Sequence, residues 1–101
     1  MATIYKVVFR KRAKNAFDRL DPVLQRQLAR KLLERSHNPR VPADALSGMR
    51  DCYKIKLRSS GLRLAYLVQD DRIVLLVLAV GKREREEVYR EAHTELSRIY
   101  D

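Results

Sequence analysis

The chain has 101 residues, of which 46% are hydrophobic and 35% charged, with a formal net charge of +9. These values predict a single globular domain, residues 1–101, whose core forms without metal or disulfide staples. The only cysteine, Cys52, excludes an internal disulfide, and no Cys/His spacing matches a zinc site. We expect Cys52 to be a small buried strand residue.

The charge pattern predicts an anionic partner. Residues 1–40 hold eleven Lys/Arg against three Asp/Glu, whereas residues 82–101 are nearly neutral. A merely solvated basic surface is the alternative. The N-terminal cations argue against a signal peptide, and the longest apolar run, residues 73–80, is far shorter than the ~20 residues that span a bilayer. We therefore expect a cytoplasmic protein without membrane contact.

Residues 3–9 are rich in β-formers and predict a first strand. Apolar residues at helical spacing then predict a helix, and they are Ala13, Ala16, Phe17 and Leu20. Asp21 followed by Pro22 is typical of an N-cap and first helical position, so a second helix starts there and fades near His37. Its buried stripe is Leu24, Leu28 and Leu32. The short connection predicts an antiparallel helical hairpin.

Four cations of the second helix fall largely outside its leucine stripe. They are Arg26, Arg30, Lys31 and Arg35. We expect them to form a basic outer surface suited to contact with phosphates.

The rest of the chain reads as strands and a last helix. Residues 38–50 are a loop, residues 51–66 two strands of a hairpin, and residues 72–80 a central strand that is apolar on both faces and ends at Gly81. Residues 84–100 form a helix whose apolar stripe is Val88, Ala92, Leu96 and Ile99. The order β-α-α-β-β-β-α predicts an α+β fold with a mostly antiparallel four-stranded sheet, an N-terminal helical hairpin and a C-terminal helix.

The hairpin is the most informative segment. With Ser60-Gly61 as a two-residue loop, Arg58 faces Arg63, Lys56 faces Ala65 and Lys54 faces Leu67. The four cations then share one face, while the opposite face is apolar and carries Tyr53, Ile55, Leu57, Leu62, Leu64, Tyr66 and Val68. A three-residue loop would send Arg63 to the apolar side, whereas a four-residue loop keeps the same alternation.

This cationic face suits RNA cleavage. The chain has no Ser-His-Asp arrangement, phosphate-binding glycine loop or metal-ligand cluster, so we expect no cofactor or metal ion. RNA brings its own nucleophile, the 2′-hydroxyl, and cations can stabilise the charge that develops on phosphorus. A lysine among other cations has its charged form disfavoured, which suits proton transfer near neutral pH.

Three segments closely resemble the RelE toxins of bacterial toxin–antitoxin systems, namely residues 51–61, residues 63–66 and residues 80–89. The resemblance extends through Phe17, the second helix and residues 46–49, although Ser47 stands where relatives commonly have a basic residue. It implies a RelE/ParE-like fold and a ribosome-dependent endoribonuclease, an mRNA interferase that cuts the codon held in the ribosomal A site and so inhibits translation.

The family's catalytic residues fall on Lys54, Lys56, Arg63, Arg83 and Tyr89. Tyr89 has been viewed as the general base and Arg83 as the general acid. Because arginine hardly deprotonates in proteins, we expect Lys54 or Lys56 to transfer protons and the arginines to bind phosphate. Tyr89 would orient the 2′-hydroxyl or stack on a base. Arg58 and Lys82 are further expected RNA contacts.

The resemblance also implies partners. They are the ribosome with its mRNA and a RelB-like antitoxin, whose acidic segment would fold on the basic toxin and displace the last helix. We expect the toxin alone to be monomeric. A non-catalytic inhibitor that occupies ribosomal RNA would have the same composition and remains an alternative. The related ParE group shares the fold but targets gyrase and lacks this set of Lys, Arg and Tyr residues.

Overall fold

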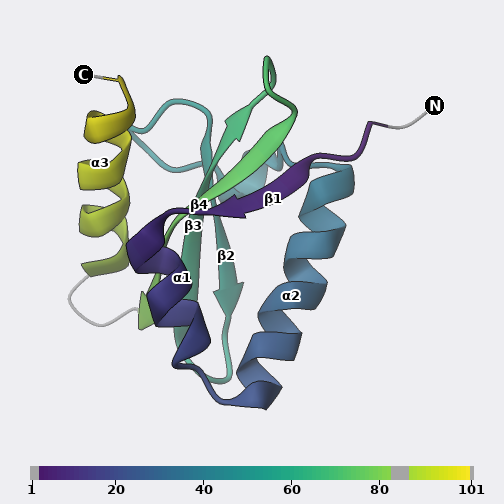
Figure 1. The fold of residues 1–101 in the computed structure, drawn as a ribbon, viewed down its shortest axis with the longest axis vertical. Coiled ribbons are helices and arrows are strands. Elements are labelled where there is room, and N and C mark those ends of the chain that lie inside the picture. The colour runs from purple at the N-terminus through teal and green to yellow at the C-terminus, as the bar shows by residue number, and fades with distance from the viewer. Residues whose placement is uncertain (1–2, 83–86, 101) are drawn as a thin grey trace.

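A four-stranded sheet forms the middle layer of the molecule, with the strand order β1-β4-β3-β2 (Figure 1). The computed structural model describes residues 3–82 and 87–100. The strands are β1 (Lys6–Phe9), β2 (Cys52–Leu57), β3 (Leu62–Gln69) and β4 (Val74–Lys82). β1 runs parallel to β4, and the other neighbours are antiparallel. The expected α+β fold with a mostly antiparallel sheet is therefore confirmed.

The central position of β4 is as its apolar sequence predicts, but several strand limits differ, and β3 continues to Gln69, beyond the predicted hairpin end at residue 66. β1 begins only at Lys6, because the Tyr5 N–H donates to the Ser36 carbonyl (2.9 Å) instead of joining the sheet. β4 begins at Val74 after a turn in which Ile73 has a φ of 55°. It also continues through Gly81 to Lys82, so the prediction that Gly81 ends the strand is wrong.

Two N-terminal helices cover one face of the sheet. They are α1 (Lys11–Asp18) and α2 (Pro22–His37), and they run in opposite directions, as expected (Figure 1). The Asp21 carboxylate accepts hydrogen bonds from the N–H groups of Val23 (2.8 Å) and Leu24 (3.2 Å), which confirms the predicted N-cap.

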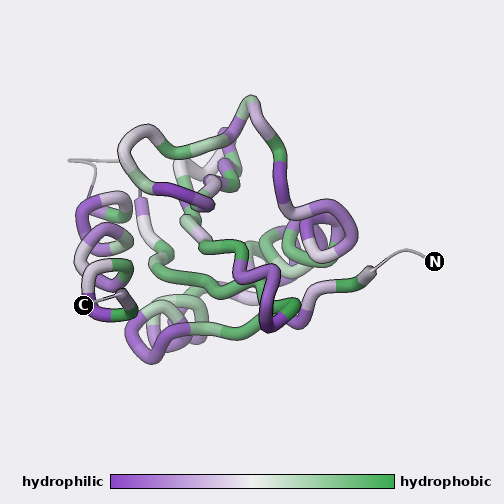
Figure 2. Tube along the Cα trace, turned by 90° about the horizontal axis from the view of Figure 1, so that it is seen from above, coloured by the Kyte–Doolittle hydropathy of each residue, from purple (hydrophilic) through white to green (hydrophobic). Residues whose placement is uncertain are grey.

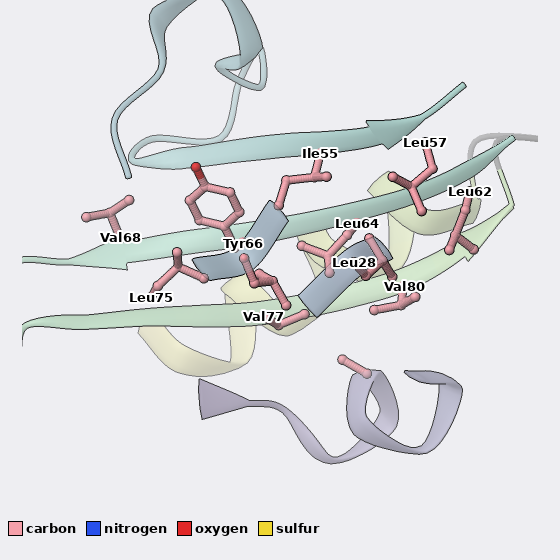
Figure 3. Close-up of a cluster of buried hydrophobic side chains, with 12 residues drawn as sticks. Leu28, Ile55, Leu57, Leu62, Leu64, Tyr66, Val68, Leu75, Val77 and Val80 are labelled. Carbon is pink, nitrogen blue, oxygen red and sulfur yellow. The ribbon is translucent and has the colours of Figure 1, made fainter. Parts of the chain in front are cut away.

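The core on this face combines α1 and α2 with the apolar side of the hairpin. Leu28 of α2 is fully buried and lies among side chains of β2, β3 and β4 (Figure 3). The predicted apolar hairpin residues from Ile55 to Val68 all belong to this core, and Tyr53 packs against it.

The second face is covered by helix α3 (Glu87–Tyr100), so the molecule has three layers. Val88 and Ala92 of α3 belong to a second buried cluster that also contains Ala65, Leu67 and Cys52. Burial raises the pKa of the Cys52 thiol to about 12, so it stays neutral. The helices turn their hydrophobic sides toward the sheet (Figure 2). Residues 84–86 of the expected last helix lie outside the described residues.

The hairpin between β2 and β3 has a longer loop than the preferred prediction. Leu57 pairs with Leu62, so Lys56 faces Arg63 and Lys54 faces Ala65. The predicted pairings of Arg58 with Arg63, Lys56 with Ala65 and Lys54 with Leu67 are therefore wrong. The loop has four residues because the Gly61 N–H bonds back to the Leu57 carbonyl (3.0 Å), with Gly61 at a φ of 73°. This is the alternative that keeps the alternation of faces.

Candidate active site

Lys54, Lys56 and Arg63 project from the same face of the sheet. Lys54 and Lys56 alternate along β2, and Arg63 of β3 lies directly opposite Lys56. Arg63 is also paired with Gly81 on β4, so it stands between the lysines and the centre of the sheet. Its side chain is 8% exposed, whereas both lysines are half-buried. The structure thus brings together the three strand residues that the sequence singled out.

The electrostatics of this group are set by repulsion between like charges. The positive charge of Lys54 is the main reason why the pKa of Lys56 is lowered, followed by burial, a hydrogen bond with Lys54 and the charges of Arg63 and Arg58. The ion pairs described for residues 3–82 and 87–100 include none of Lys54, Lys56 and Arg63. An anion bound here would relieve this repulsion.

Two further cations lie at the hairpin loop, and only Arg58 belongs to this face, because Lys82 is paired with Leu62 of the apolar face. Arg58 is exposed in the loop, and its charge acts on Lys56, so the two lie close together. Lys82 ends β4 opposite Leu62, and its ammonium group donates to the Ser60 carbonyl (3.3 Å). Lys82 therefore ties the end of β4 to the hairpin loop.

Helix α3 packs closely against β4 beside Arg63. A Cβ atom placed on Gly81 would lie 3.0 Å from Val88 Cγ2, so any larger residue here would require Val88 to give way by a few tenths of an ångström. Tyr89 follows Val88, is half-buried and packs against the core on the same face of the sheet as Lys54 and Lys56. Arg83, the remaining expected catalytic residue, lies outside the described residues.

The basic surface expected on α2 is present in part. Arg26, Arg30 and Lys31 are exposed on the helix that covers the opposite face of the sheet. Arg35 is not on this outer surface, and that expectation is wrong. Its side chain is 15% exposed and forms an ion pair with Asp44 (2.6 Å). Arg35 follows Leu32 by three residues and Leu28 by seven, so it lies on the leucine stripe itself, and its side chain reaches the Lys54 carbonyl of β2.

One buried charged residue within α3 was not predicted from the sequence. Glu95 is 4% exposed and accepts hydrogen bonds from Arg10 Nε (2.7 Å) and from Arg98 (3.0 Å). Arg10 precedes α1, so this contact fastens α3 to the N-terminal part of the chain. The helical spacing could have indicated this burial, because Glu95 falls three residues after Ala92 and seven after Val88, on the buried stripe of the helix.

Among the described residues, no group of three or more His, Cys, Asp or Glu side chains is placed to hold a metal ion. Within the same part of the chain, no helix has the length and apolar character needed to cross a membrane. The chemistry described here rests on ammonium, guanidinium and phenol groups.

Comparison with known proteins places this arrangement in a family. The model of the ParE toxin of type II toxin–antitoxin systems matches residues 7–87. The mRNA interferase toxin RelE of Escherichia coli K12 is 51% identical over 88 residues, which are 87% of this chain and 93% of that protein.

Solved structures of E. coli RelE share the fold. A mutant of this toxin with two arginines replaced by alanine, in the free state, has a TM-score of 0.85 at 48% identity and covers 93% of this chain and 97% of its own. The intact E. coli RelBE toxin–antitoxin complex matches with a TM-score of 0.78 at 48% identity, over 80% of this chain and 99% of the other. This chain therefore belongs to the RelE toxins, within the ParE/RelE family of type II toxin–antitoxin systems.

Proposed function

We propose that this protein is a ribosome-dependent endoribonuclease that cuts mRNA in the ribosomal A site and thereby inhibits translation. The observation that carries the proposal is the cluster of Lys54, Lys56 and Arg63 on one sheet face, in a chain 51% identical to an mRNA interferase. The lowered pKa of Lys56 adds a group that exchanges protons closer to neutral pH than an ordinary lysine does.

In the proposed reaction the 2′-oxygen of the substrate attacks the adjacent phosphorus, and the bond from phosphorus to the 5′-oxygen breaks. Lys54 or Lys56 accepts the proton of the 2′-hydroxyl or supplies one to the leaving oxygen. Arg63, nearly buried, stabilises the negative charge that builds up on the phosphate. Arg83 and Tyr89 are assigned by resemblance, Arg83 to the phosphate and Tyr89 to the 2′-hydroxyl or a base.

Dependence on the ribosome follows from the small size of this group. A few side chains on an open sheet offer little to align a flexible RNA strand for in-line attack, whereas the ribosome holds the codon in place. Exposed Arg26, Arg30 and Lys31, together with Arg58 and Lys82, would bind RNA phosphates. The reaction would take place in the cytoplasm, with the toxin as a monomer.

The experiment is primer extension on mRNA after incubation of the purified protein with programmed ribosomes. New 5′ ends within the A-site codon are expected. The variant Lys56→Ala should produce none, although it should still bind ribosomes and sediment together with them. Arg19→Ala, an exposed change at the end of α1, is the matched control and should cut normally. Stalled ribosomes without new 5′ ends would show instead a non-catalytic inhibitor. Rapid cleavage of free RNA at the same concentration would contradict the dependence on ribosomes.

We further propose that a RelB-like antitoxin neutralises this toxin. The proposal is supported by the solved complex of the E. coli relatives and by the formal charge of +9, which favours an acidic partner segment. Limited proteolysis should show altered protection of α3 when the antitoxin binds. Unchanged protection of that helix would contradict its displacement.

A further inference from the structure

The strand that carries Lys54 and Lys56 lies at the edge of the sheet. In an antiparallel pair, alternate residues of a strand turn their peptide groups toward the partner strand and away from it. The Asp51 carbonyl accepts from the Val68 N–H of β3 (2.9 Å), which places the carbonyls of Cys52 and Lys54 on the outer side of β2. The outward carbonyl of Cys52 is satisfied by the segment that precedes β2, since the Leu46 N–H donates to it (2.9 Å).

At Lys54 the donor comes from a helix on the other side of the sheet. Nη1 of Arg35, in the last turn of α2, donates to the Lys54 carbonyl (3.1 Å) and to the Tyr66 hydroxyl (2.9 Å). Its Nη2 pairs with the Asp44 carboxylate (2.6 Å) in the short helix η1 (Pro42–Asp44). One guanidinium group thus joins β2, β3 and η1, and takes the place that a neighbouring strand would occupy.

The partners of Arg35 are themselves fixed. The Tyr66 hydroxyl donates to the Pro39 carbonyl (2.6 Å), and the Tyr66 ring is fully buried in the core. The Arg35 side chain is 15% exposed. Little freedom is therefore left to the guanidinium group, and its hold on the Lys54 peptide is rigid.

We infer that Arg35 is a positioning residue for the candidate catalytic lysines, which holds the Lys54 peptide at the sheet edge and so sets the separation of the Lys54 and Lys56 ammonium groups. This inference rests on the proposed function. The carbonyl that Arg35 binds belongs to the residue whose side chain emerges on the catalytic face. A shift of about 1 Å at reacting groups can reduce a rate about a hundredfold.

The geometry requires arginine at this position. One branch of the fork holds Asp44, while the other reaches Tyr66 and Lys54. A lysine has a single ammonium group at the end of its chain and cannot hold acceptors in this forked arrangement. Arg35→Lys keeps the charge and most of the apolar stem, and it therefore tests the fork itself.

The expected result for Arg35→Lys is a fall of about ten- to a hundredfold in single-turnover cleavage on programmed ribosomes, with the concentration for half-maximal rate unchanged. The matched control is Arg40→Lys. Arg40 also forms a fork, to Asp51 (2.9 Å) and Asp70 (2.7 Å), but among the described residues its hydrogen bonds and ion pairs do not include Lys54 or Lys56. It should lower thermal stability without lowering the rate of the folded protein.

A second measurement does not depend on cleavage. The charges that face Lys56 are those of Lys54, Arg63 and Arg58 among the described residues, and Lys54 acts most strongly. If Arg35→Lys lets Lys54 move, the pKa of Lys56, followed by NMR of its side-chain nitrogen, should rise toward the ordinary lysine value. Arg40→Lys should leave it in place.

The outcomes separate the two proposals. If the unchanged protein cuts ribosome-bound mRNA but Arg35→Lys changes only thermal stability, with the rate and the pKa of Lys56 intact, Arg35 has a purely structural role and the inference is overturned. If the unchanged protein does not cut mRNA, the proposed function fails. The NMR measurement then still decides whether Arg35 sets the environment of Lys56.

Discussion

The side chains of Lys54, Lys56 and Arg63 carry like charges that repel one another unless an anion lies between them. Lys56 faces Arg63 across two strands and shares its strand face with Lys54. Like charges at such positions destabilise a sheet. The fold accepts this cost because the opposite face of the same strands buries Ile55, Leu57 and Leu64. The cationic face is thus maintained by the apolar packing on the other side of the same strands.

The first prediction concerns the pH dependence of cleavage. Since the charge of Lys54 is the main cause of the lowered pKa of Lys56, Lys54→Met should raise that pKa. If Lys56 transfers a proton, the limb of the pH–rate profile that reports it moves to higher pH, whether Lys56 acts as base or as acid. Single-turnover rates on programmed ribosomes from pH 6 to 10 would show the shift.

The overall rate of Lys54→Met is also expected to fall, because a cation near the phosphate is lost. The quantity to compare is therefore the pH at which the rate changes, and not the maximal rate. Lys82→Met is the control at the hairpin end, since Lys82 is absent from the causes of the Lys56 shift. A limb that stays in place in Lys54→Met would exclude Lys56 as the titrating group.

At the scale of secondary structure, the docking of α3 decides whether Tyr89 reaches the catalytic face. Two features fasten this helix to the body of the protein. Near its start, Val88 lies over Gly81 of β4, and further along, Glu95 is clamped by Arg10 and Arg98. Each feature gives a prediction that separates helix placement from global folding.

Gly81→Ala should displace the start of α3. The added Cβ would lie 3.0 Å from Val88 Cγ2, closer than ordinary contact, so the helix must shift by a few tenths of an ångström. We expect a loss of cleavage with stability reduced by only about 1 kcal/mol. The double change Gly81→Ala with Val88→Ala restores room and should recover activity relative to Gly81→Ala. A double variant no better than Gly81→Ala would refute the steric account.

Glu95→Gln should loosen α3 through the loss of its charged hydrogen bonds. The Glu95 side chain is 5% exposed, but Arg10 and Arg98 are 36% and 60% exposed, so solvent compensates in part. We expect a destabilisation of about 1.5 kcal/mol, measured by urea unfolding, with faster amide exchange in α3. Glu91→Gln is the control, since its pair with Arg12 spans 3.5 Å and both side chains are more exposed. Equal losses in the two variants would contradict the clamp.

The same scale shows why the sequence predicted some elements better than others. The face alternation of the hairpin was predictable, because seven apolar residues must be buried together and only a loop of two or four residues allows this. The pairing itself was not, since it depends on how Gly61 closes the loop by a backbone hydrogen bond. The N-cap at Asp21 is local chemistry and could be read directly.

Contacts between distant segments were the part that the sequence could not give. Arg35 belongs to the same helix as Arg26 and Arg30 and differs from them only by its angle to the leucine stripe. Its three acceptors come from residues 44, 54 and 66, which the fold alone brings together. Helical periodicity did indicate that Arg35 is buried, since it follows Leu32 by three residues and Leu28 by seven, but it could not indicate which acceptors the side chain would meet.

At the scale of the whole molecule, positive charge occupies two opposite sides. Lys54, Lys56 and Arg63 lie on the α3 side of the sheet, whereas Arg26, Arg30 and Lys31 lie on α2, which covers the other side. A single bound strand of RNA would not contact both sides. The separation suits a protein that lies between several RNA segments, with the mRNA on one side and ribosomal RNA on the other.

The last prediction follows from this separation. Each Lys or Arg that neutralises a phosphate releases counterions, so the logarithm of ribosome affinity should fall linearly with the logarithm of salt concentration. The triple change Arg26→Gln, Arg30→Gln and Lys31→Gln should weaken binding equally for all A-site codons and reduce the slope by about 2 to 3. The cleavage rate of ribosomes saturated with the variant should match that of the unchanged protein, because α2 covers the face opposite the catalytic group. Gln27→Ala, on the same helix, controls for helix content and should leave the slope unaltered. A salt dependence unaffected by the triple change would show that α2 faces solvent on the ribosome. A lower cleavage rate of ribosomes saturated with the variant would show that the two basic sides do not act independently.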